Sequence, residues 1–228
     1  GSGILPDLST KLPLRDFEAI AGRRLVSELG AMRLREPESR SSGSGLTLLS
    51  LKDYIKFRLC GEFSTDPVHA AYTGLFDVRN EVWSPALARA LSIDMAELPE
   101  VRPASAVVGE TTPSVTHELG FAQPVGVVNG GPDGSVAVVG AGATTPGIAV
   151  DVAGTSDVLL VCTDAPYIHP DMAVVTNPHP LGRSWLVGGA TGVTGGAVRQ
   201  LLGYLGSDMS DLSFSTLERE AMELPVGS

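Results

Sequence analysis

Apolar and polar residues follow a helical period in the first half of this chain. In residues 46–60 an apolar side chain recurs every three to four positions, which predicts a helix that ends at Gly61. Its apolar face is expected at Leu48, Leu51, Ile55 and Leu59. Shorter helices are predicted at 85–91, where Ser84 is the N-cap residue, and near 113–119.

The pattern changes after residue 123. An apolar strand is predicted at 124–129, followed by a glycine turn and a helix of small residues that starts just after Asp133. Apolar segments at 147–152, 157–163, 172–176 and 184–188 then predict the strands of a meander, and 190–205 predicts a final helix. This order of elements indicates an α/β protein with a lobe boundary near residues 143–146.

Composition and charge narrow the function classes. The 228 residues carry 16 basic and 26 acidic side chains, a net charge of −10. This balance argues against nucleic acid and anionic membranes as partners, because both attract basic surfaces. Glycines, a proline and two aspartates interrupt the most apolar stretch, 136–161, so no membrane helix is expected. Two distant cysteines and four scattered histidines give no metal-site pattern. We expect a cytoplasmic protein.

Asp133 is the first candidate for chemistry. It follows a predicted strand and the glycines Gly130 and Gly131, which allow a ligand to approach the backbone. A carboxylate at the end of a strand can act as a general base on a hydroxyl. The alternative is a helix N-cap, since aspartate before a helix satisfies free N–H groups. The two roles do not exclude each other.

The second candidate is the turn Gly154, Thr155 and Ser156 between two predicted strands. Backbone N–H groups and two hydroxyls at such a turn can hold a phosphate, but the same residues form ordinary hairpin turns. Three aspartates bracket this hairpin and could bind magnesium through water, although solvated strand ends have the same composition: Asp151, Asp157 and Asp164.

Five segments together resemble the FGGY carbohydrate kinases. In order they are TLLSLKDYIKFRLCGEFSTD (47–66), AAYTGLFDVRNEVWSPAL (70–87), LPEVRPASAVVGETT (98–112), PVGVVNGGPDGSVAVVGAG (124–142) and VAGTSDVLL (152–160). The resemblance implies a ribonuclease-H-like, actin-like fold of two lobes. The domains expected from it are an N-terminal segment with a linker (1–45), the C-terminal part of the first lobe (46–143) and the N-terminal part of the second lobe (144–228).

The resemblance also implies an ATP- and Mg²⁺-dependent kinase of a ketose or polyol, xylulokinase-like. Asp133 matches the family's catalytic base, and it contacts the sugar together with Thr73 and Gly134. The turn Gly154–Thr155–Ser156 matches a phosphate loop, although Asp157 stands where the family usually has glycine. No metal-ligating residue is assigned.

Two family motifs are not found in the sequence. Residues 1–45 hold no Asp-x-Gly-Thr phosphate loop, and the chain stops before the adenosine-binding glycines. The chain is therefore expected to be truncated and inactive alone. Truncation would expose apolar surface, through which two copies could form a homodimer. The alternatives are a non-catalytic sugar-binding or interaction module and an unrelated α/β domain.

Overall fold

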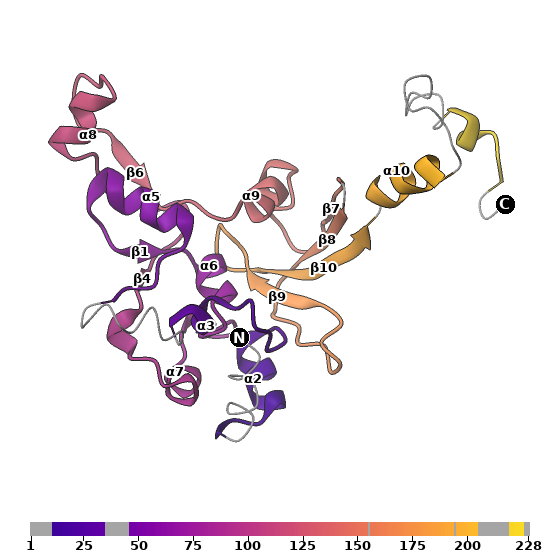
Figure 1. Cartoon of the computed structure of the whole chain (residues 1–228), viewed down its shortest axis with the longest axis horizontal. Helices are drawn as coiled ribbons and strands as arrows, with labels where there is room; N and C mark the ends of the chain where they lie inside the picture. The colour runs from indigo at the N-terminus through magenta and orange to yellow at the C-terminus, as the bar shows by residue number, and fades with distance from the viewer. Residues whose placement is uncertain (1–10, 35–45, 155, 194, 205–218, 226–228) are drawn as a thin grey trace. The chain divides into compact units, whose positions relative to one another are not determined.

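The computed structural model describes residues 11–34, 46–154, 156–193, 195–204 and 219–225. Figure 1 shows the helices and strands along the chain, which contacts divide into two units. Unit 1 contains Gly1–Val150 and Leu160–Gly189, and unit 2 contains Asp151–Leu159 and Ala190–Ser228. Within the described ranges no helix has both the length and the apolar character needed to cross a membrane.

Helices and short strands alternate along the chain. The helices are α2 (Leu14–Ala21), α3 (Gly30–Leu34), α5 (Leu51–Cys60), α6 (Pro67–Tyr72), α7 (Pro85–Leu91), α8 (Pro113–Glu118), α9 (Asp133–Gly140), α10 (Gly195–Tyr204) and the 3-10 turn η1 (Met95–Glu97). The strands are β1 (Ser64–Thr65), β2 (Phe76–Asp77), β3 (Val82–Trp83), β4 (Glu100–Val101), β5 (Val107–Glu110), β6 (Gly126–Val128), β7 (Ala149–Val152), β8 (Ser156–Thr163), β9 (Val175–Pro178) and β10 (Trp185–Val193).

Three helices begin with the same local chemistry. In α6, α7 and α8 a proline occupies the first turn, and the residue before it caps the helix. The capping side chains of Asp66, Ser84 and Thr112 accept hydrogen bonds from backbone N–H groups of the first turn. The sequence predictions for α7 and α8 are confirmed, and this cap also fixes the backbone of Asp66.

The main apolar core of unit 1 lies among α2, α3 and α7. Phe17, Met32, Leu75, Leu87 and Leu91 are all buried there. Burial of such side chains stabilises a fold by about 1.5–3 kcal/mol each. Helices α5 and α6 and the short strands β1–β6 belong to the same unit as this core.

Pairs of short strands connect distant segments of unit 1. Strands β1 and β4 are parallel, with Ser64 opposite Glu100 and Thr65 opposite Val101. Strands β5 and β6 are antiparallel, with a register shift between Val107 and Gly109. Strand β6 lies within the predicted strand 124–129, and it leads directly into the loop before Asp133.

The predicted meander is wrong in its order. The four-stranded sheet has the order β7-β8-β10-β9, so β10 lies between β8 and β9. Strand β9 pairs with β10 in an antiparallel register, whereas residues 164–174 separate it from β8. A connection of that length does not force consecutive strands to be neighbours, in contrast to a tight hairpin.

The predicted helix at 190–205 begins later than expected. Strand β10 continues to Val193, and α10 starts at Gly195. Gly192 has a φ of +110°, which a right-handed helix cannot contain. The apolar spacing that suggested a helix from residue 190 therefore extends over the end of a strand.

The apolar face predicted for α5 is also wrong. Ser50 caps the helix, and Gly61 ends it in a left-handed conformation, as expected. However, Leu51 is 77% exposed and Ile55 is 52% exposed, whereas Asp53 and Lys56 are buried. Helix α5 contacts β1, β5 and β6. Its polar side faces inward because the charged side chains there have buried partners, such as Asn129 for Lys56.

Candidate functional site

Asp133 is the first residue of α9, and its side chain is exposed to solvent. Its Oδ1 accepts a hydrogen bond from the backbone N–H of Gly134 at 2.7 Å. The N-cap residue is Pro132, which makes no side-chain capping bond, so the N-cap interpretation of Asp133 is wrong. A negative charge in the first turn of a helix is favourable. The carboxylate is therefore held at a helix N-terminus with its second oxygen available.

The loop before Asp133 is anchored through its backbone. Gly130 has a φ of +73°, a conformation that favours glycine. The N–H groups of Asn129 and Gly130 donate to the carbonyls of Ala106 and Ala104, each at 2.8 Å. A side chain at Gly131 would meet Asp66 Oδ1 at 3.9 Å. The loop is thus packed against a buried carboxylate.

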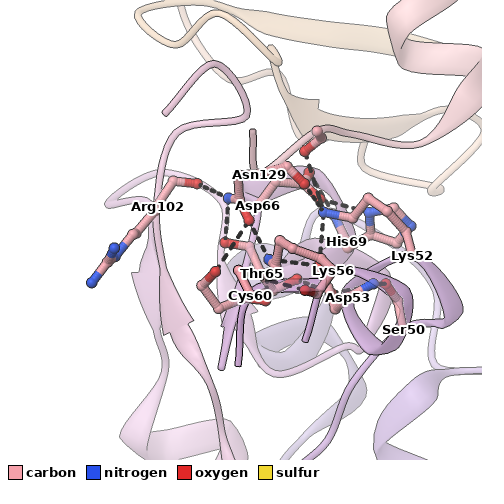
Figure 2. Close-up of polar contacts among 12 residues, drawn as sticks. Ser50, Lys52, Asp53, Lys56, Cys60, Thr65, Asp66, His69, Arg102 and Asn129 are labelled. Atoms are coloured by element: carbon pink, nitrogen blue, oxygen red, sulfur yellow. Dashed lines mark hydrogen bonds and ion pairs between the residues drawn. The ribbon is translucent and has the colours of Figure 1, made fainter. Parts of the chain in front are cut away.

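Behind this loop lies a buried polar cluster, which Figure 2 shows. We call it the Lys–Asp cluster and define it by Lys52, Asp53, Lys56, Asp66 and Asn129. The ammonium group of Lys56 donates to Asn129 Oδ1, to the carbonyl of Ser64 at 2.6 Å and to Asp53 at 3.2 Å. These three bonds satisfy all three donors of a lysine that is only 3% exposed.

The side chain of Asn129 connects the cluster to two backbone segments. Its amide Nδ2 donates to the carbonyl of Thr65 at 3.0 Å and to that of Arg102 at 2.8 Å (Figure 2). Its Oδ1 accepts from Lys56 and from the hydroxyl of Ser64. A buried amide with this many partners fixes the end of β6 against β1 and the chain after β4.

The charges of the cluster balance. Two lysines face two aspartates, and Lys52 lies 2.7 Å from Asp53 and 3.0 Å from Asp66. Burial alone would raise the pKa of Asp53, but hydrogen bonds from Lys52 and Thr65 outweigh it, so the pKa of Asp53 is below its ordinary value. Burial is likewise outweighed at Asp66 by His69 and Lys52, and the pKa of Asp66 is also lowered. Burial lowers the pKa of Lys56, partly offset by Asp53.

These shifts predict acid sensitivity. A carboxyl with a lower pKa in the folded state stabilises the fold above its unfolded pKa, and this contribution is lost as the pH falls toward the folded pKa. The urea midpoint should therefore drop as the pH approaches and passes below the unfolded value of 3.8. The Asp66→Asn variant should show a shallower drop than wild type, and Glu110→Gln, on the surface and outside the cluster, should keep the wild-type slope. Equal slopes in Asp66→Asn and wild type would contradict the assignment.

A pocket of about 210 Å³ lies beside the cluster in unit 1. Its lining includes Thr65 and His69, and His69 Nδ1 lies 2.6 Å from the buried Asp66. Tyr72 and Trp83 also line it. Thr73, predicted to contact substrate, lies in this lining as well. Its hydroxyl donates to the carbonyl of Ala70 at 2.6 Å and accepts from Leu75 N–H at 3.0 Å, so it also shapes the end of α6.

The predicted phosphate turn, residues 154–156, belongs to unit 2. The N–H of Gly154 donates to Asp157 Oδ1 at 3.2 Å, Ser156 begins β8, and Thr155 lies outside the described residues. A backbone N–H that binds a carboxylate oxygen has the chemistry that a phosphate oxygen requires. In the described part of the turn, Asp157 occupies this N–H group, and the phosphate role of the turn stays a prediction.

The structure brings some predicted site residues together. Asp133 and Gly134 adjoin at the start of α9, while Thr73 lines the pocket, whose lining does not include Asp133 or Gly134. Sequence reasoning missed Lys52, Lys56 and Asn129. A signal existed for the lysines, since Asp53 and Lys56 are three residues apart on a helix and share one face. That spacing is equally typical of a solvated face.

Comparisons with known proteins identify the family. Residues 32–140 match the model of the N-terminal domain of the FGGY family of carbohydrate kinases. Xylulose kinase of Escherichia coli K12 is 32% identical over 134 residues, which are 59% of this chain and 28% of that protein. Residues 32–140 therefore belong to the N-terminal domain of the FGGY family. Autoinducer-2 kinase of the same strain is 29% identical over 133 residues, or 25% of its length.

Solved FGGY kinases share the fold. Xylulose kinase from Rhodospirillum rubrum has a TM-score of 0.87 at 22% identity, over 99% of this chain and 46% of that chain. Plasmodium falciparum glycerol kinase with ADP has a TM-score of 0.76 at 19% identity, over 89% of this chain and 42% of that chain. The expected actin-like, ribonuclease-H-like α/β fold is confirmed. This FGGY chain spans less than half the length of these structures, and its match covers less than a third of the curated relatives.

Proposed function

We propose that the full-length protein is an ATP-dependent carbohydrate kinase that phosphorylates a hydroxyl of a ketose or polyol, as xylulose kinases do. The observation that carries this proposal is the exposed carboxylate of Asp133 on a loop anchored by buried charges. Family membership supports the reaction class. MgATP would supply the γ-phosphoryl group.

Asp133 acts as the general base in this proposal. Its carboxylate accepts the proton of the sugar hydroxyl as that oxygen becomes the nucleophile. Because phosphoryl transfer has a loose transition state, catalysis depends mainly on positioning and charge rather than on covalent help. The bond from Gly134 N–H to Oδ1 orients the carboxylate, and this leaves Oδ2 for the sugar. A fixed base supports the in-line geometry that the reaction needs.

The remaining assignments complete the proposal. Gly134 and Thr73 contact the sugar, and Gly154, Thr155 and Ser156 hold a phosphate of the nucleotide. The Gly154 N–H, which donates to the carboxylate of Asp157, is a donor that a phosphate oxygen would use in its place. The proposal also places the boundary between the two lobes at residues 143 and 144 and the protein in the cytoplasm. It further includes a homodimer, which sedimentation of the full-length protein tests.

The decisive experiment is a phosphorylation assay of the full-length protein. MgATP is offered with xylulose, ribulose and glycerol in turn, and the sugar phosphate is detected by phosphorus NMR. We expect ADP and a sugar phosphate in equal amounts, with a ketose preferred over glycerol. Calorimetry with each sugar and with MgATP tests the alternative. Sugar binding without nucleotide binding or turnover would overturn the kinase proposal and favour a sugar-binding module.

A further inference from the structure

Lys52 occupies a place in the Lys–Asp cluster that the proposed reaction does not use. Its ammonium group contacts the buried carboxylates of Asp53 and Asp66. The same nitrogen donates to the backbone carbonyl of Asn129 at 2.9 Å and to that of Gly130 at 3.2 Å (Figure 2). Lys52 therefore joins two buried negative charges to the chain three and four residues before Asp133.

The other polar groups of this loop are also committed. The N–H groups of Asn129 and Gly130 bond to carbonyls of the chain before β5, so the N–H and the C=O of the peptide between Asn129 and Gly130 are both hydrogen-bonded. Pro132 is buried and its φ is restricted, so the residue that directly precedes Asp133 has little conformational freedom. A shift of the Asn129 and Gly130 carbonyls should therefore also shift Asp133.

Lys52 differs from its neighbour Lys56 in burial. The Lys52 side chain is 24% exposed, whereas that of Lys56 is 3% exposed. Without Lys52, the contacts of Lys56 with Asp53, Ser64 and Asn129 remain. Loss of Lys52 should therefore loosen the loop without removing the interior of the cluster, in contrast to loss of Lys56.

We propose that Lys52 is a positioning residue for Asp133: its ammonium group ties the Asn129 and Gly130 carbonyls to Asp66 and thereby fixes the catalytic loop. This inference rests on the proposed kinase function. Asp66 also contacts His69, which lines the pocket. The contacts of Asp66 with His69 and Lys52 therefore connect the pocket lining to the loop. An error of about 1 Å in the placement of a catalytic group can cost about 10²-fold in rate.

The test uses three variants of the full-length protein. Lys52→Met keeps the aliphatic stem and removes the charge, Lys52→Arg restores a charge, and Arg58→Met removes an exposed charge from the same helix as a control. We expect Lys52→Met to lower kcat by about 10²-fold with little change in KM, because the base is misplaced while the sugar still binds. Lys52→Arg should recover most of the loss, and Arg58→Met should match wild type.

Amide hydrogen exchange provides a readout that does not need turnover. In Lys52→Met the amides of Asn129 and Gly130 should exchange faster, while those of core helices such as α7 stay protected. Unchanged exchange, or faster exchange throughout the unit with an equal loss of folded protein, would overturn the positioning role. If wild type shows no kinase turnover but the amides of Asn129 and Gly130 still exchange faster in Lys52→Met, the proposed function is overturned. The role of Lys52 in fixing the loop is then supported.

Discussion

Replacement of Asp133 by asparagine should lower kcat for sugar phosphorylation by about 10²–10⁴-fold, the usual contribution of a positioned general base. Asparagine has nearly the same shape, and its carbonyl oxygen can still accept the bond from Gly134 N–H. The loop and α9 should therefore stay folded, and sugar affinity should change little. Steady-state kinetics of the full-length protein, together with calorimetry of sugar binding, separate the loss of chemistry from loss of binding.

Asp94→Asn is a suitable control for this experiment. Asp94 is also exposed, and it caps a short helical turn, which asparagine can do equally well. This variant should keep the kcat and KM of wild type. If Asp133→Asn retained wild-type kcat, Asp133 would not be the base, although the kinase class itself could still hold. If both binding and kcat disappeared together, the carboxylate would serve the sugar site rather than proton transfer.

Replacement of Lys56 by methionine should destabilise the fold by about 3–5 kcal/mol, because the two buried carboxylates of Asp53 and Asp66 are then left with one lysine, Lys52, between them. Asp53 would lose the bond at 3.2 Å, and Asn129 Oδ1 and the Ser64 carbonyl would lose their donor. Methionine fills a similar volume, so the effect reports on polar pairing rather than on a cavity. Urea denaturation monitored by tryptophan fluorescence measures the change in the free energy of unfolding.

Two further variants make the interpretation specific. Arg58→Met, on the exposed side of α5, should change stability by no more than about 0.5 kcal/mol. The double variant Asp53→Leu with Lys56→Met removes both charges of a pair, so it should recover part of the loss. A Lys56→Met protein as stable as Arg58→Met would show that the buried bonds of Lys56 contribute little to the fold.

The sequence was informative where local chemistry decides the structure. Proline after Ser84 and Thr112 predicted the starts of α7 and α8, since N-caps act within one helical turn. Strand β6 and helix α9 were also predicted from their composition. The failures involve partners that are distant along the chain: the inward face of α5 depends on Asn129, and the order of the last sheet depends on how β9 and β10 pair.

The candidate site divides in the same way. Asp133 could be selected from the sequence because a carboxylate after two glycines has few structural uses other than capping, and the family resemblance supported it. The Lys–Asp cluster could not, because lysine and aspartate at the surface of a helix are ordinary. Only the geometry reveals that these side chains are buried and that their contacts extend to Asn129 and Gly130.

The long sequence separation within the cluster has a consequence for folding. Lys56 and Asn129 are 73 positions apart, so α5 is synthesised well before the amide that completes its inward face. Until then its lysines and aspartate are paired with water, and no apolar stripe holds the helix against the strands. Contacts of this kind require closure of a long loop before they stabilise anything, which slows their formation. During synthesis, α5 should therefore pack against the strands late. This packing requires that β6 and Asn129 have already been synthesised.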